Sequence, residues 1–202
     1  MRQAKAISAM QFEVERKFWV NDFKVMLTGL DTLGSSVDEG VEQVDQYFNH
    51  PSKDFVKTDE VLRIRNVGDA NFVTYKGARI DSTTKTRHEL ELPLGDGPQN
   101  LKDFGSMLTL LGFSPIMTVR KFRRKAMCDW EGIPIEICLD EIDQLGTFVE
   151  LEATTDARGL ENAKERLSSL AAQLGLTRSE RRSYLELLQH QLAPQRMDRG
   201  DS

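Results

Sequence analysis

The sequence predicts an α+β protein in which a closed β-sheet encloses a charged lumen and helices flank its outside. Charged and apolar residues alternate along most of the predicted strands, so each strand has one charged and one apolar face. The charged faces hold mainly acids and bases, whereas an ordinary solvated face also mixes in Ser, Thr, Asn and Gln. A sheet with one solvated face explains any single strand, but the series favours a barrel with a wet, charged interior.

Four segments have apolar residues at helical spacing, which predicts that each packs against the sheet. The first begins with a capping Asn or Asp and closes on Gly34, which are the start and stop signals of a helix. Packed in this way, the helices would bury the apolar outer face of the barrel. The predicted helices cover residues 21–34, 100–113, 157–175 and 181–192.

The strands carry most of the information, because alternate side chains along a strand share a face. Seven strands are predicted at residues 12–18, 61–67, 71–78, 86–94, 119–127, 133–142 and 147–153, and residues 41–49 offer a further strand with Asp45 and Tyr47 on one face. Together the seven strands place acids and bases on one face. The acids are Glu13, Glu15, Glu89, Glu91, Glu136, Asp140, Glu150 and Glu152, and the bases are Lys17, Arg63, Arg65, Lys76, Arg87, Lys121, Arg123 and Lys125.

Length and composition set the broad class. With 202 residues, 39% hydrophobic and 29% charged, the chain is expected to fold as one globular domain over residues 1–190, with residues 191–202 as a disordered tail. The net charge of −5 argues against general nucleic-acid binding, and no apolar run is long enough for a membrane span. The first ten residues lack a signal-peptide core, so a cytoplasmic location is expected. Whether the chain is a monomer or a homodimer stays open.

A lumen with this many charges needs ligands or internal ion pairs, because desolvated charges are costly when they stand alone. Clustered Arg and Lys side chains suit phosphate oxygens. Clustered carboxylates suit a hard divalent cation such as Mg²⁺. Acids and bases together therefore predict a site for a metal ion and a polyphosphate, in which the metal offsets the repulsion between the carboxylates and the phosphates.

The same residues form a series of motifs along the chain. Residues 13–17 read EVERK, an E-x-E-x-K motif, and its companions follow in order: Arg63 and Arg65, Lys76, Glu89 and Glu91, Lys121 and Arg123, Asp140, Glu150 and Glu152, and the closing RRSYLELL. As a set over residues 12–188 they resemble the CYTH domain of the triphosphate tunnel metalloenzymes. That family includes class IV adenylate cyclases, thiamine triphosphatases and inorganic triphosphatases. The resemblance implies an eight-stranded antiparallel tunnel flanked by helices.

The resemblance also implies roles for particular residues. It assigns coordination of Mg²⁺ or Mn²⁺ to Glu13, Glu15, Glu150 and Glu152, with Glu89, Glu91 and Asp140 contributing directly or through water. It assigns the grip on the triphosphate to Lys17, Arg63, Arg65, Lys76, Lys121, Arg123 and Arg182. The catalytic set is then Glu13, Glu15, Lys17, Glu150 and Glu152. Arg87 and Lys125 share the charged face but receive no family role, and Tyr184 is expected to pack or to buttress Arg182.

Two reactions share this machinery: water can attack the terminal phosphorus of a triphosphate, or the ribose 3′-hydroxyl of ATP can attack the α-phosphorus and give cyclic AMP and pyrophosphate. The carboxyl-terminal half looks more like the class IV cyclases. Those cyclases resemble one another in a His-Phe pair just before E-x-E-x-K, where this chain reads AISAMQF. Hydrolysis of an inorganic, nucleoside or thiamine triphosphate is therefore favoured. Adenylate cyclase is the alternative, and a non-catalytic polyphosphate- or nucleotide-binding module is the second alternative.

Overall fold

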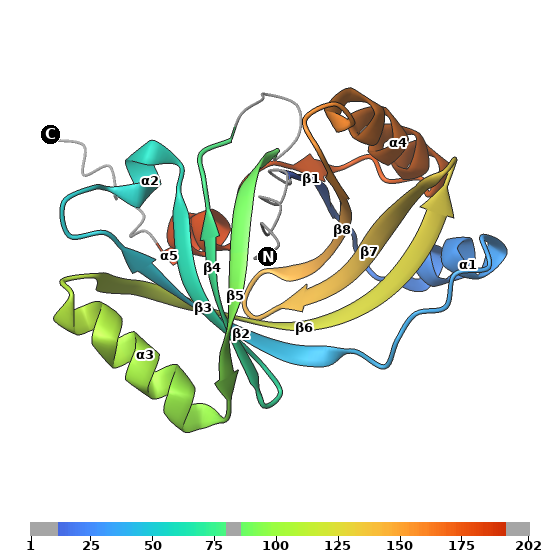
Figure 1. Ribbon diagram of the computed structural model, residues 1–202. Helices are drawn as coiled ribbons and strands as arrows, with labels where there is room; N and C mark the ends of the chain where they lie inside the picture. Colours follow the sequence, from blue (N-terminus) through green and yellow to red (C-terminus); the bar gives the residue numbers. More distant parts are fainter. Residues whose placement is uncertain (1–11, 80–85, 193–202) are drawn as a thin grey trace, which may run out of the picture.

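Eight antiparallel strands close into a barrel in a computed structural model that describes residues 12–79 and 86–192 (Figure 1). Neighbouring strands pair in the order β5-β4-β3-β2-β6-β7-β8-β1, and a further pairing of β1 with β5 closes the ring. This confirms the predicted fold class. The strands are β1 (Phe12–Trp19), β2 (Val41–Asn49), β3 (Val61–Val67), β4 (Ala70–Lys76), β5 (Arg87–Asp96), β6 (Ser114–Trp130), β7 (Ile133–Ile142) and β8 (Gly146–Thr155), and the short β9 (Ser179–Glu180) pairs with β1 outside the ring.

The helices lie on the outside of the barrel (Figure 1). Beside β6, β7 and β8 lie α1 (Lys24–Thr32) and α4 (Leu160–Gln173), while α3 (Pro98–Leu110) lies on the opposite side of the molecule. All four predicted helices are present, each within or close to its predicted bounds, and the last is α5 (Tyr184–Leu192). The one-turn α2 (Phe55–Thr58) and the two-residue β9 were not predicted, because both are too short to show a period.

The apolar core lies between the helices and the outer face of the sheet, as the alternating pattern requires. Leu167 and Leu170 of α4 are fully buried against Val14 of β1 and Leu151 of β8. Burying a side chain of this size contributes roughly 1.5–3 kcal/mol. A smaller cluster joins α5 to Phe148 and Tyr47, and another joins α3 to Phe48 and Ile64. Apolar packing outside the ring leaves most of the inside for charge, whereas the α5 cluster lies on the inner side, since its Tyr47 and Tyr184 line the cavity.

Strand register decides which charges meet inside the ring. In β1 and β8, Glu15 lies opposite Glu152 and Lys17 lies opposite Glu150. On its other side β1 pairs with β5, where Glu13 lies opposite Arg87. Directly opposed residues of antiparallel strands project to the same face. β1 therefore brings carboxylates of β1 and β8 together, with Arg87 of β5 on the same face.

The prediction that residues 1–190 form one domain includes positions outside the described part of the chain and stays a prediction. The tail prediction falls mainly on residues 193–202, which also lie outside it, while Gln191 and Leu192 belong to α5. None of the helices in the described ranges has the length and apolar character needed to cross a bilayer. Cys128 and Cys138 are both buried and form no disulfide.

Candidate active site

The barrel encloses a cavity of about 250 Å³. Most of the predicted site residues line it: Glu13, Glu15, Lys17, Arg63, Arg65, Lys76, Glu89, Glu91, Lys121, Arg123, Glu150 and Glu152. Arg87, Lys125 and Glu136, which share the charged face without an assigned role, line it as well, together with Tyr47, Val61, Ser183 and Tyr184. Asp140 and Arg182, two of the predicted site residues, are not among the lining residues.

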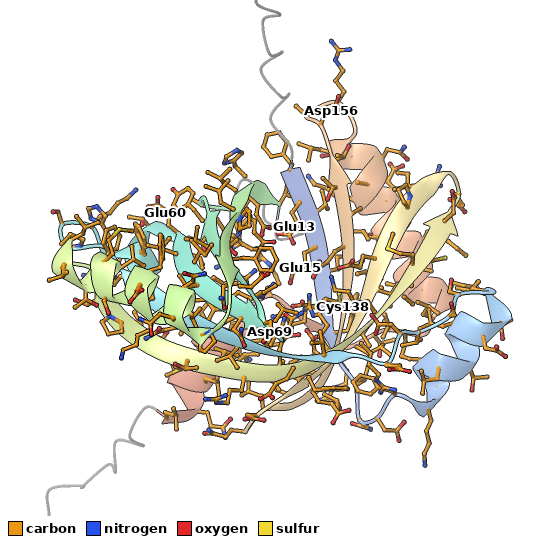
Figure 2. All side chains as sticks on the ribbon, turned by 60° about the horizontal axis from the view of Figure 1, so that its bottom comes forward. Glu13, Glu15, Glu60, Asp69, Cys138 and Asp156 are labelled. Carbon is orange, nitrogen blue, oxygen red and sulfur yellow. The ribbon has the colours of Figure 1, made fainter. Side chains whose placement is uncertain are left out.

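Three carboxylates meet on one side of the cavity and are called the acidic cluster here: Glu13, Glu15 and Glu152. Each offers an oxygen atom, and these atoms all lie within 4.8 Å of one another. Figure 2 labels Glu13 and Glu15, which follow one another along β1, and Glu152 comes from the neighbouring β8. The period of two along β1 and its register with β8 bring the cluster together.

Burial and mutual repulsion disfavour ionisation within the acidic cluster, although Lys76 pairs with Glu13 and Arg123 pairs with Glu152. Burial and the neighbouring carboxylates of Glu13, Glu150 and Glu15 raise the pKa of Glu152 to about 8, although Arg123 opposes the shift. Burial also raises the pKa of Glu13, which shares a hydrogen bond with Glu89. Burial opposes ionisation of Glu89 too, but that hydrogen bond and the charge of Lys76 lower its pKa to about 2. Burial thus disfavours the ionised forms of both Glu13 and Glu152.

The acidic cluster fits a hard divalent cation. Its three converging donors are all carboxylate oxygens, the ligand type that Mg²⁺ and Mn²⁺ prefer. A bound cation would also offset the burial and the repulsion that disfavour the ionised forms of Glu13 and Glu152. Cys138 forms a second group with Glu136 and Glu152, but its thiol is fully buried and its pKa is raised by burial, so the all-oxygen group is the better fit.

Cations gather on the strands around β2, which lies across the ring from β1 in strand order. They are called the basic cluster here: Arg63 and Arg65 of β3, and Lys121 and Arg123 of β6. Burial and the nearby charge of Arg123 lower the pKa of Lys121 to about 8, although Asp140 opposes the shift. Burial thus disfavours the charged form of Lys121 even though Asp140 lies 3.7 Å away, and an incoming phosphate would add a further anionic partner.

Two short carboxylates lie beneath the basic cluster and hold it. Asp45 of β2 accepts hydrogen bonds from Arg65 Nε at 2.6 Å and Nη2 at 2.7 Å, and Arg63 Nη1 approaches it to 3.3 Å. Asp140 of β7 accepts a hydrogen bond from Arg123 Nε at 2.7 Å. Both aspartates are almost completely buried. An Asp side chain is one methylene shorter than Glu, so these carboxylates stay at the wall while the arginines reach the cavity.

Glu150 is embedded among cations. It forms an ion pair with Lys17 at 3.2 Å and another with Arg123. Lys17 Nζ also donates a hydrogen bond to the backbone carbonyl of Arg182 at 3.0 Å and lies 3.6 Å from the centre of the Tyr184 ring. The structure thus brings Glu150 to the cavity on the side of the bases, and Glu152 on the side of the acids.

The Arg182 side chain does not line the cavity. Its guanidinium pairs with Glu180, with 2.6 Å between Nη2 and Oε2, and is about half exposed. Only its backbone carbonyl approaches the site, through Lys17. Within the described part of the chain, no hydrogen bond joins Tyr184 to the Arg182 guanidinium. Instead, the Tyr184 hydroxyl donates to Asp140 Oδ2 at 2.8 Å, and its ring packs under Lys17.

Asp45 and Tyr184 are two residues at the site for which the sequence predicts no role at the metal or the phosphates. Asp45 was placed on one face of a predicted strand, and its position opposite Arg65 is visible only once β2 and β3 are paired. Tyr184 begins α5, and the path of the chain into that helix decides which way its ring points. The sequence signal for this role is an Asp on the charged face of a strand, next to a strand that carries arginines on the same face.

Known proteins resemble this chain in sequence and in fold. A model of the CYTH domain family matches residues 11–184. A Methanocaldococcus jannaschii protein named "Putative adenylate cyclase MJ0240" is 34% identical over 178 residues, which cover 87% of this chain and 97% of that protein. Among solved structures, PH1819 of Pyrococcus horikoshii OT3 is 33% identical with a TM-score of 0.78, covering 89% of this chain and 99% of that one.

A third similar structure is more distant in sequence. It is a Hippeastrum protein, named "Putative adenylyl cyclase HpAC1" and described as having a dominant triphosphatase activity. It is 16% identical to this chain with a TM-score of 0.62, and the comparison covers 90% of this chain and 96% of that one. At this identity the likeness is one of fold.

Proposed function

The chain belongs to the CYTH domain family, and from this premise we propose that it is a metal-dependent phosphohydrolase that cleaves a triphosphate inside the barrel. Members of the family are adenylate cyclases or triphosphatases that depend on a metal and bind small triphosphates. The observation that carries the proposal is one cavity in which the acidic cluster faces the basic cluster. A metal ion and a polyphosphate need these two kinds of ligand side by side.

Each cluster has its own task in the proposed reaction. Glu13, Glu15 and Glu152 would hold a Mg²⁺ or Mn²⁺ ion, which supplies charge neutralisation at the phosphate and lowers the pKa of bound water. Arg63, Arg65, Lys121 and Arg123, with Lys17 and Lys76, bind the non-bridging phosphate oxygens. They orient the chain of phosphates and stabilise the charge that develops on it. The oxygen of water forms a bond to the terminal phosphorus and loses a proton. The bond between this phosphorus and the bridging oxygen breaks, and the bridging oxygen leaves as part of the diphosphate.

The roles of the remaining predicted residues follow from their places. Glu89 and Glu91 line the cavity from β5, beside the acidic cluster, and so are proposed to contribute to metal binding through water. Glu150 and Asp140 are proposed to act by holding Lys17 and Arg123, because both carboxylates already bind those cations. Arg182 is proposed to contribute its backbone carbonyl, which holds Lys17, since its side chain pairs with Glu180.

Cyclisation of ATP is the second candidate function. The observation that favours it is the name of the M. jannaschii relative, with which this chain shares 34% identity over nearly its whole length. The same clusters would then hold ATP with its α-phosphorus beside its own 3′-hydroxyl. The two reactions differ in which phosphorus lies in line with the nucleophile, and they release different products.

One panel of substrates tests both candidates. The full chain is incubated with tripolyphosphate, ATP and thiamine triphosphate, each with Mg²⁺ and with Mn²⁺, and phosphate, pyrophosphate and cyclic AMP are measured separately. Phosphate release supports the hydrolase, whereas equal amounts of cyclic AMP and pyrophosphate from ATP would support the cyclase. Release of no product from any substrate would leave a binding module and contradict the proposed function.

A further inference from the structure

Asp45 of β2 contacts two arginines of the basic cluster without lining the cavity itself. We propose that Asp45 is a positioning residue that fixes the Arg65 guanidinium, and with it Arg63, in the orientation in which they bind phosphate. The inference rests on the proposed function in one respect, namely that these two arginines contact the phosphates. It assigns a role to a carboxylate that would otherwise only weaken the positive charge of the basic cluster.

Arg65 and Asp45 form a bidentate pair. Arg65 donates through Nε at 2.6 Å and through Nη2 at 2.7 Å, one bond to each oxygen of Asp45. Two parallel bonds fix the plane of the guanidinium as well as its position. The backbone register explains the meeting, because Asp45 and Arg65 lie directly opposite each other in β2 and β3. Asp45 is only 2% exposed, whereas Arg65 lines the cavity.

The bonds to Asp45 use only some of the donor groups of Arg63 and Arg65, so other donors of both guanidinium groups remain for a ligand. The bond pair to Asp45 uses Nε and Nη2 of Arg65, so its Nη1 edge is the one left for an incoming phosphate. Arg63 approaches the same carboxylate only through Nη1, at 3.3 Å. Its Nε is buried and has no hydrogen-bond partner within the described ranges. One aspartate thus orders two guanidinium groups that would otherwise repel each other.

Charge and orientation predict opposite effects when Asp45 is neutralised. If only the electrostatic potential mattered, removal of a buried negative charge would tighten the binding of an anion. If Asp45 sets the orientation of the arginines, its removal frees Arg65 to rotate and binding becomes weaker. The sign of the change in affinity therefore separates the two accounts without any reference to turnover.

The probe is bis(methylene)triphosphonate with Mg²⁺, in which methylene groups replace the bridging oxygens so that no hydrolysis can occur. Its affinity is measured by calorimetry for the wild-type chain and for Asp45→Asn. We expect Asp45→Asn to weaken binding about tenfold, the scale of loss when a partner that orients a binding group is removed. Asp45→Glu keeps the charge but moves the carboxylate outward, and we expect it to weaken binding as well. This second variant decides the matter if Asp45→Asn does not fold.

A double-mutant cycle tests whether Asp45 acts through Arg65. Lys cannot form the bidentate pair, so in an Arg65→Lys background Asp45→Asn is expected to change the affinity less than about twofold. Glu42→Gln is the matched control, because it removes a largely exposed carboxylate from the same strand. It is expected to leave the affinity within about twofold. Thermal melts of each variant establish that it is folded.

Three results would overturn the inference. They are unchanged or tighter binding by Asp45→Asn, undiminished weakening by Asp45→Asn in the Arg65→Lys background, and failure of the wild-type chain to bind the triphosphonate. A different result would contradict the proposed function but not the role of Asp45. A wild-type chain that binds the triphosphonate but releases no product from any triphosphate would contradict hydrolysis and leave the role of Asp45 intact.

Discussion

The acidic cluster and the basic cluster line the same cavity, yet the protein treats their charges differently. Glu13 and Glu152 have raised pKa values because burial and neighbouring carboxylates disfavour their ionised forms. The arginines of the basic cluster are held by Asp45 and Asp140, two buried carboxylates that the cavity does not reach. The acidic cluster thus needs a cation to balance its carboxylates. The arginines of the basic cluster are already held in place without a bound anion. The comparison indicates that the metal completes the acidic side of the site.

The largest effect is expected from the acidic cluster. Glu13→Gln keeps the size of the side chain but removes one of the three converging carboxylates, so metal-dependent turnover of the preferred triphosphate should fall roughly 10³-fold. The thermal stability should change little, because burial already disfavours the ionised form of Glu13 and the variant places a neutral amide of the same size there. Turnover and melting temperature are measured side by side. Wild-type rates in this variant would remove Glu13 from the metal site.

Glu150 should behave in the opposite way, although it lies two residues from Glu152 along β8. Glu150→Gln leaves Lys17 and Arg123 without one of their buried partners, and loss of a buried partner costs about 3 kcal/mol. Urea denaturation of the variant without ligands measures this loss of unfolding free energy. A stability equal to that of the wild type would mean that Glu150 does not hold these two cations.

The basic cluster should control substrate binding more than metal binding. Arg65→Ala removes charge-assisted hydrogen bonds to phosphate, so KM for the triphosphate should rise about thirtyfold. The dissociation constant for Mn²⁺ alone should stay within about twofold, since Arg65 is not part of the acidic cluster. Steady-state kinetics and a Mn²⁺ titration give the two values. An unchanged KM would exclude Arg65 from the phosphate-binding set.

The smallest effect is a pH dependence of metal binding. Because the pKa of Glu152 is about 8, the free protein retains a proton there at neutral pH, and a bound cation must displace it. Affinity for Mn²⁺ should therefore rise with pH until about 8, by less than tenfold per pH unit, as calorimetry at several pH values can measure. The metal-free protein should lose stability over the same window, because the stabilising contribution of Glu152 is complete below about 4.5 and is lost as pH rises through 8. Affinity that is constant from pH 6 to 8 would contradict this.

Most of the fold could be predicted because the period of two is unusually regular in this chain. Along β1, Glu13, Glu15 and Lys17 share a face while Val14 and Phe18 are fully buried on the other, and the same separation recurs around the ring. The one-turn α2 and the two-residue β9 could not be predicted, because they are shorter than any window in which a period shows.

The details of the site depend on strand register and on side-chain length, which a single sequence does not reveal. Glu150 and Glu152 look equivalent in sequence, but Lys17 lies opposite the first and Glu15 opposite the second. Asp140 shares the face of the glutamates, yet its shorter side chain ends at Arg123 below the cavity. The direction of the Arg182 side chain is set by Glu180 in the chain segment that leads into α5.

The most direct test of the account is the release of phosphate from tripolyphosphate by the purified chain, with Mg²⁺ or Mn²⁺ and with a chelator in place of the metal. The acidic cluster needs a cation and the basic cluster needs a polyphosphate, so we expect release with the metal and none with the chelator. Equal rates with and without the metal would contradict the role of the acidic cluster. If no phosphate is released under any condition while cyclic AMP forms from ATP, the protein is an adenylate cyclase and the proposed hydrolysis is wrong.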